Sequence, residues 1–222
     1  MTAARDTVLG AIRGALAPRC TTGAAEVDAR LAARVRNLVP ARAQVAGRTA
    51  IDDFQRMATD AAANVVRVRA WDRVPGAVQE ILRGENYAAR LVMAPDPHLS
   101  ALPWAARTLE VREGRAEADD QVSLGRALVG IAETGTLMLA SGPQSPTTLG
   151  FLPEMHVVAL AAEDIVGAYE DGWARLRAKG PMPRTVNFIT GPSRSADIEQ
   201  TLQMGAHGPR KLAIVIVDPE AP

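Results

Sequence analysis

The sequence predicts an α/β protein in which helices flank a mostly parallel sheet. From Thr49 onward, short apolar runs alternate with stretches of helical periodicity, and strands that are joined by helical crossovers pair in parallel. The last apolar run, residues 212–217, is partly β-branched and fits a strand buried on both faces. A chain of 222 residues, 47% of them hydrophobic, is long enough to enclose a full core.

The first 48 residues predict a separate helical arm. Two segments carry apolar side chains at helical spacing, and Pro18 with the turn at residues 21–23 divides them. The apolar positions are Leu9, Ile12 and Leu16 in the first segment, and Val27, Leu31, Val35 and Leu38 in the second. This region contains eight arginines but only three acidic residues, and such a run of charge is typical of a solvated helix face. The alternative is an arm that docks on a partner or a second subunit. We therefore divide the chain into an arm, residues 1–48, and an α/β domain, residues 49–222.

The elements of the α/β domain follow from apolar periodicity and from glycine or proline at their ends. Helices are expected at residues 51–62, 72–82, 163–179 and 195–204, and strands at residues 64–68, 90–94, 108–112, 155–160, 185–189 and 212–217. Two more strands flank residues 133–135. Because that corner is too short for a crossover, this pair should be antiparallel. Residues 95–103 and 142–153 are expected to be long loops.

Composition excludes several classes of protein. The 25 acidic and 25 basic residues balance, so no nucleic-acid partner is expected. Cys20 is the single cysteine, and the three histidines are far apart, so we expect neither a metal site nor any other cofactor in this chain. No apolar run has the length of a signal peptide core or a membrane span, which predicts a soluble cytoplasmic protein.

The first candidate site is the corner Glu133-Thr134-Gly135-Thr136, which interrupts two apolar strands. A glycine lets backbone amides approach a ligand closely, and neighbouring N–H groups in a turn can bind an anion. The hydroxyls of Thr134 and Thr136 add donors. Glu133 is a candidate base, nucleophile or orienting group. A capped hairpin turn with an exposed glutamate is an equally good interpretation of this spacing.

The second candidate site begins where the strand at residues 185–189 ends. Ligands of open α/β sheets bind at the carboxyl ends of strands, where helix N-termini present free N–H groups. The candidate ligand-binding residues here are Gly191, Ser193, Arg194, Asp197 and Glu199. Arg194 suits a carboxylate or phosphate. The structural alternative makes Ser195 a helix cap and pairs Arg194 with the acids that follow it.

Two histidines complete the set of candidates. His207 lies between small residues in the segment 204–210, where its imidazole is a candidate acid or base. A hydrogen bond to loop backbone is the plainer role for it. For His156, which opens a strand, we expect a structural, hydrogen-bonded role.

Taken together, these segments resemble the LUD-domain family, typified by the lactate utilisation protein C (LutC/YkgG) group. The resemblance rests on residues 130–137, Leu152-Pro153 with His156, residues 191–199 and residues 205–210, which come in the family's order across about residues 50–218. The sequence departs from the family's usual pattern at Ser195, where threonine is common, and at Ala206, where many relatives have valine.

The resemblance implies a Rossmann-like fold of the NagB/RpiA/CoA-transferase type. It also implies a role in oxidising L-lactate to pyruvate together with partner proteins that carry iron–sulfur clusters. The single cysteine agrees with a placement of the clusters on partner proteins, because an iron–sulfur cluster needs several thiolates. The ligand would be a small carboxylate or phosphate at strand-end loops, and a homo-oligomer is compatible with the sequence.

Three functions stay open at this point. We favour a component of a lactate-oxidising assembly that itself carries out no redox step. The second is a free-standing isomerase or an acyl- or CoA-transferase-like enzyme that uses Glu133; this comparison is one of fold only. The third is a non-catalytic ligand-binding scaffold. The sequence does not show that the chain performs chemistry by itself.

Overall fold

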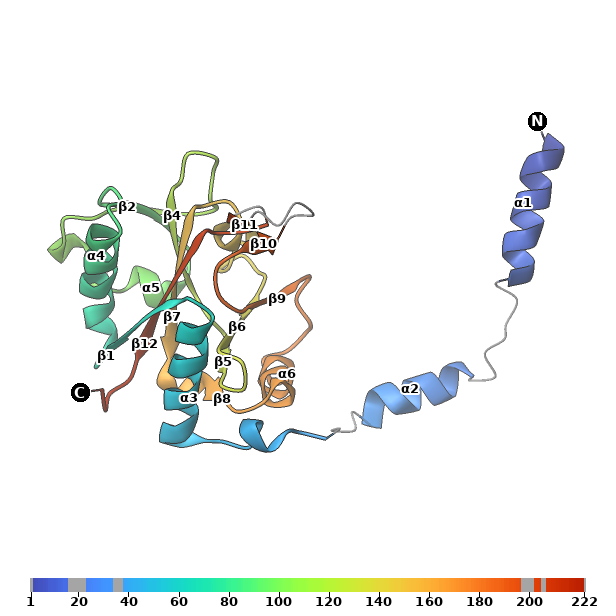
Figure 1. Cartoon of the computed structure of the whole chain (residues 1–222), viewed down its shortest axis with the longest axis horizontal. Helices are drawn as coiled ribbons and strands as arrows, with labels where there is room; N and C mark the ends of the chain where they lie inside the picture. Colours follow the sequence, from blue (N-terminus) through green and yellow to red (C-terminus); the bar gives the residue numbers. More distant parts are fainter. Residues whose placement is uncertain (1, 16–22, 34–37, 197–201, 205–206, 222) are drawn as a thin grey trace. The chain divides into compact units, whose positions relative to one another are not determined.

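The computed structural model describes residues 2–15, 23–33, 38–196, 202–204 and 207–221. The chain forms two compact units, residues 1–38 and 39–222. The first unit holds helices α1 (Thr2–Ala15) and α2 (Ala24–Ala33) (Figure 1). The apolar side chains of Val8, Ile12, Val27 and Leu31 on these helices are exposed. The predicted boundary at residue 48 stays a prediction. Within the described ranges, no helix has the length and apolarity that crossing a membrane requires.

The second unit is built on a six-stranded sheet in which every neighbouring pair is parallel (Figure 1). In spatial order, its strands are β1 (Asn64–Val68), β12 (Lys211–Val217), β7 (Met155–Ala161), β4 (Val122–Arg126), β2 (Arg90–Met93) and β3 (Glu110–Glu113). Strand β7 is buried along its whole length, and β12 at all but its first residue. This confirms the predicted fold class and the prediction of a doubly buried strand at residues 212–217.

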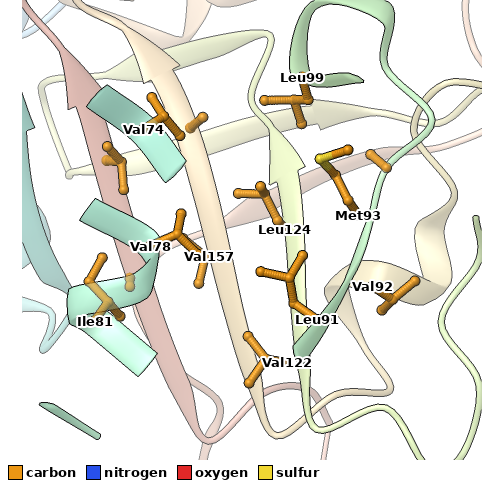
Figure 2. Packing of buried hydrophobic residues seen from close by; sticks show 14 of the residues in the cluster. Val74, Val78, Ile81, Leu91, Val92, Met93, Leu99, Val122, Leu124 and Val157 are labelled. Carbon is orange, nitrogen blue, oxygen red and sulfur yellow. The ribbon is translucent and has the colours of Figure 1, made fainter. Parts of the chain in front are cut away.

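Alternate residues of the central strands supply two separate cores. Val157 and Val215 face helix α4 (Val74–Gly84), and Val158 and Ile214 face helix α3 (Gly47–Asp60). Figure 2 shows the first core, in which Val74, Val78 and Ile81 of α4 lie beside Val157 of β7 and belong to one cluster with side chains of β2 and β4. Burying one such aliphatic side chain stabilises the fold by about 1.5–3 kcal/mol. The two-sided burial explains why these strands are continuous apolar runs.

A second, four-stranded sheet packs against the α3 side. Its order is β8 (Ile165–Val166), β5 (Val129–Ile131), β6 (Thr136–Ala140) and β9 (Val186–Ile189). Strands β5 and β6 are antiparallel, as the short corner between them predicts. Leu137 and Leu139 of β6 join the core around α3, whereas Met138 points to the other face and packs in a cluster with Leu176 of helix α6 (Tyr169–Ala178).

Short elements complete the unit. They are helix α5 (Pro97–Ser100), the 3-10 turns η1 (Ala41–Ala43), η2 (Trp71–Arg73), η3 (Trp104–Ala106), η4 (Thr147–Gly150) and η5 (Ala162–Asp164), and the antiparallel pair β10 (Arg194–Ala196) and β11 (Leu202–Met204). The predicted helix at residues 195–204 is therefore wrong in its described part, and Ser195 caps no helix. The pairing of Ser195 with Gln203 supplies the backbone hydrogen bonds that a helix would have made.

Two further predictions fail for tertiary reasons. The predicted helix at residues 163–179 begins only at Tyr169, because Ile165 and Val166 pair with β5. Gly167 packs closely against the 3-10 turn η1, and an added Cβ would be 2.0 Å from the carbonyl oxygen of Ala43. Strand β4 was not predicted, because Ser123 and Gly125 interrupt its apolar pattern. Both small residues face the second sheet's side, where an added Cβ on Gly125 would be 3.1 Å from Nε2 of His156.

Candidate functional site

The topology of the large sheet creates a cleft between strands β2 and β4. After β2 the chain continues to β3 at one edge, whereas after β4 it passes through the smaller sheet to β7 on the other side. Such a switch point, at the carboxyl ends of parallel strands, is where open α/β sheets bind their ligands. Asp96 follows β2 and Arg126 ends β4, so the fold brings these two residues together across 30 positions of sequence.

A buried carboxylate holds the arginine of this cleft. Asp96 is 8% exposed, and its Oδ2 accepts a hydrogen bond of 2.9 Å from Nε of Arg126. Its Oδ1 accepts the backbone N–H of His98 at 2.8 Å and so caps α5. Among the described residues, Arg126 forms its ion pair through Nε alone. The terminal nitrogens of the guanidinium therefore remain available to bind a carboxylate or phosphate.

Two hollows meet at this ion pair. One, of about 310 Å³, is lined by Gln144, Ser145 and Lys179 as well as by Asp96 and Arg126. The other, of about 580 Å³, also has Asp96, Arg126 and Gln144 in its wall and extends to Trp71 and His98. Their size is that of small-molecule sites. With two cations against one carboxylate, the first hollow suits an anion.

The sequence reasoning missed this cleft. Arg126 was not singled out because the strand that it ends was not recognised. A basic residue at the carboxyl end of a strand, with a Pro-Asp-Pro turn after a neighbouring strand, would have been the signal.

A smaller hollow lies beside the first one and contains His156. It measures about 10 Å³, and it shares Ala140 and Ser145 with the cleft. His156 is 1% exposed, and in the described part of the protein neither ring nitrogen has a hydrogen-bond partner. Burial lowers the pKa of its imidazole to about 4, so the ring is neutral at physiological pH. The hydrogen-bonded role predicted for His156 is therefore wrong as far as the described residues go.

The predicted corner at residues 133–136 is closely packed. Gly135 has a φ of +66°, and an added Cβ would be 2.2 Å from the backbone nitrogen of Ala58 in α3. The hydroxyl of Thr136 is fully buried and lies 2.6 Å from that of Thr134 and 2.9 Å from that of Tyr169. Packing and hydrogen bonding within the protein therefore explain why these residues occur at the corner. The ligand-binding role of Thr134, Gly135 and Thr136 stays a prediction.

Glu133 is bound to a neighbour as well. Its side chain is 10% exposed, and Oε1 accepts a hydrogen bond of 2.9 Å from Arg42, whose own side chain is 70% exposed. The backbone N–H of Glu133 donates to the carbonyl oxygen of Gly167 at 3.0 Å. Arg42 thus occupies one oxygen of this carboxylate, and the catalytic role predicted for Glu133 stays a prediction.

The second predicted segment lies beside the corner. The hydroxyls of Thr190 and Thr136 are 2.5 Å apart, and Gly191, with a φ of +81°, abuts the carbonyl oxygen of Ala61 just beyond α3. The backbone of Arg194 begins β10. Asp197 and Glu199 lie outside the described residues. The roles predicted for Gly191, Ser193, Arg194, Asp197 and Glu199 stay predictions.

The third segment meets the second. The N–H of Ser193 donates to the carbonyl oxygen of Pro209 at 2.8 Å, and the N–H of His207 donates to Oγ of Ser193 at 3.3 Å. The imidazole of His207 is exposed, which leaves its predicted acid–base role untested. The structure thus brings all three predicted segments into one connected region. Among the described residues, no three His, Cys, Asp or Glu side chains are grouped so that they could hold a metal ion.

The fold and the cleft define a parallel α/β protein with a polar cleft at the switch point of its sheet. The sequence model of the LUD domain matches residues 51–217, and the chain belongs to that family. A crystal structure of a DUF162 family protein from Deinococcus radiodurans superposes with a TM-score of 0.56 over 78% of this chain and 99% of that one, at 24% identity. This similarity supports the fold.

Several relatives are similar over part of the chain. An uncharacterized protein of Neisseria meningitidis is 42% identical over 96 residues, which are 42% of this chain and 41% of that protein. Lactate utilization protein C of Geobacillus sp. is 38% identical over 112 residues, 47% of this chain and 46% of that protein. The protein of the same name from Halalkalibacterium halodurans is 29% identical over 163 residues, 66% of this chain and 70% of that protein. With the first two, the chain spans less than half of the relative's length.

Proposed function

We propose that this protein takes part in lactate utilisation and binds a small carboxylate in the cleft between β2 and β4. The observation that carries the proposal is the ion pair of Asp96 and Arg126. A buried carboxylate orients the guanidinium through Nε, and a second cation, Lys179, lines the same hollow. The names of the relatives supply the candidate ligands, lactate and its oxidation product pyruvate.

Binding can be measured on the full chain by calorimetry and by thermal unfolding with lactate, pyruvate and phosphate. A ligand at about one hundred times its Kd stabilises a folded protein by about 2.7 kcal/mol. We expect Arg126→Leu to weaken carboxylate binding at least about tenfold, because a charge-assisted hydrogen bond contributes about 1.5–3 kcal/mol. Arg83→Leu is the matched control, since the Arg83 side chain is 79% exposed on α4 and pairs there with Glu80. Equal binding by the two variants would rule out the cleft.

The oxidation itself would belong to partner proteins. One cysteine cannot supply the thiolates of an iron–sulfur cluster, so we propose that electrons pass to cluster-bearing partners in a lactate-oxidising assembly. Copurification with such proteins, and lactate-dependent electron transfer in the reconstituted assembly, would support the proposal. An assembly that oxidises lactate at the same rate without this chain would contradict it.

A further inference from the structure

We infer that the larger hollow of the cleft is a binding site for an aromatic carboxylate. The ring system of this ligand would lie against Trp71 and His98, and its carboxylate would bind Arg126. The inference rests on the proposed function in one respect, the anion-binding role of Arg126, and it adds a second class of ligand to the cleft. Three observations support it: the size of the hollow, the two aromatic rings in its wall, and the single carboxylate that positions both ends of the site.

The larger hollow exceeds what a three-carbon acid requires. At about 30 Å³ for each non-hydrogen atom, which is the volume of a water in the liquid, such an acid occupies about 180 Å³. It therefore fits within the smaller hollow of about 310 Å³. The larger hollow measures about 580 Å³ and meets the smaller one at Asp96, Arg126 and Gln144. A carboxylate on two fused rings needs about 390 Å³ by the same measure, so the larger hollow can accommodate it.

Two aromatic rings form a corner in the wall of the larger hollow. The ring centroids of Trp71 and His98 are 4.2 Å apart and the ring planes are inclined at 72°, which is an edge-to-face contact. Trp71 is half-buried and packs against the first core, so its ring has a firm support. Ala101 and Leu102 add apolar groups to the wall. Aromatic rings attract one another in edge-to-face and offset-stacked arrangements beyond the effect of the area that they bury. The corner therefore favours a planar aromatic ring over a saturated ring of the same size.

One buried carboxylate positions both ends of the site. Oδ2 of Asp96 accepts a hydrogen bond of 2.9 Å from Nε of Arg126, and its Oδ1 accepts one of 2.8 Å from the backbone N–H of His98. The guanidinium that would bind the carboxylate and the residue that contributes one ring of the corner are thus tied to the same side chain. Such preorganisation lowers the entropic cost of binding.

The sheet places the two ends of the site on one face. Leu124 of β4 belongs to the first core, and side chains two residues apart on a strand share a face, so Arg126 points to this side as well. Trp71 packs against the same core. Because the guanidinium and the indole both line the larger hollow, a ligand on this face meets both groups without crossing the sheet.

A pair of ligands that differ in aromaticity tests the inference on the wild-type protein. The aromatic acid is 2-naphthoate, and its partner is decahydronaphthalene-2-carboxylate, which has the same carbon skeleton and carboxylate with saturated rings. We expect calorimetry of the full chain to show that 2-naphthoate binds at least about fivefold more tightly. The saturated acid is the more hydrophobic of the two, so a hollow that is merely apolar would give the reverse order.

Substitutions at two tryptophans locate the site. Trp71→Leu should weaken the binding of 2-naphthoate at least about fivefold, remove the preference for it, and leave lactate affinity within about twofold, because Trp71 does not line the smaller hollow. Trp71→Phe should restore part of the preference. Trp173→Leu is the matched control. Trp173 is also half-buried, it packs on Phe188 with 5.5 Å between the ring centroids, and it lines neither hollow.

The outcomes separate this inference from the proposed function. Failure of 2-naphthoate to bind, equal affinity for the two ring acids, equal losses in Trp71→Leu and Trp173→Leu, or unchanged binding in Arg126→Leu would overturn the inference and leave Trp71 as a covering side chain of the first core. If lactate binds through Arg126 and 2-naphthoate does not bind, only this inference falls. If 2-naphthoate binds through Arg126 and lactate does not bind, the proposed function falls and the aromatic site stands.

Discussion

Acid should destabilise this protein through the neutral, buried imidazole of His156. Burial lowers the pKa of this group to about 4 in the folded protein, whereas the unfolded chain has the ordinary value of 6.5. Between these values the unfolded state binds a proton that the folded state does not bind. The free energy of unfolding therefore falls as the pH drops below 6.5, and this contribution is exhausted below pH 4, where the folded protein is protonated as well.

The size of the effect follows from the same two values. Within that window, each pH unit removes about 1.4 kcal/mol of stability. From pH 7.5 to pH 5, the loss that His156 causes is about 2 kcal/mol, and the full loss below pH 4 is about 3 kcal/mol. The free energy of unfolding of an ordinary domain is about 5–15 kcal/mol, so a loss of this size is readily measured.

The assay is urea unfolding of the full chain, followed by tryptophan fluorescence between pH 7.5 and pH 5. Trp71, Trp104 and Trp173 all belong to the α/β unit, so the signal reports on that unit. His156→Gln, which cannot titrate, is the comparison. The other titrating groups contribute to both proteins, and the difference between the two profiles isolates His156. Parallel profiles would refute the reasoning and would show that the ring is solvated or hydrogen-bonded in solution.

Two further predictions concern the corner between β5 and β6. Gly135→Ala should destabilise the fold by about 3 kcal/mol, because the new methyl group meets backbone atoms of α3 and φ is positive; Gly84→Ala, where nothing lies within 4 Å, is the control in the same unfolding assay. Glu133→Gln should leave the calorimetric affinity for lactate within about twofold of the wild type, since Glu133 lines neither hollow of the cleft and the ion pair that is lost contributes little to folding stability. A Gly135→Ala protein of unchanged stability would contradict the packing, and a Glu133→Gln protein that no longer binds lactate would make the corner the ligand site.

The sequence predicts those parts of the fold whose signals are local. The apolar run at residues 212–217 is confirmed as a strand buried on both faces. The short corner at residues 133–135 is confirmed as the turn of an antiparallel pair. Both depend on residues that are close together in the chain, so periodicity and turn length are sufficient.

Elements that depend on distant contacts are not predicted. Ile165 and Val166 become a strand because β5 lies beside them. Gly125 is tolerated in a central strand because the ring of His156 packs against it. The cleft has the same cause. Asp96 and Arg126 meet only because β2 and β4 are neighbours in the sheet, and no spacing along the chain reveals that neighbourhood.

The residues of the predicted motifs and the residues of the cleft differ in one respect. The protein itself uses the hydrogen-bonding groups of the first set and leaves those of the second set partly unused. Gly135 and Gly191 are required by backbone contacts with the end of α3, and the buried hydroxyl of Thr136 has protein partners. Packing and hydrogen bonding within the protein account for these residues without a ligand. The guanidinium of Arg126 is different, because the described protein holds it in place through Nε and leaves its terminal nitrogens unused. Preorganised groups with unused donors and acceptors are what a binding site requires, and for this reason we place the ligand between β2 and β4 rather than on the motif loops.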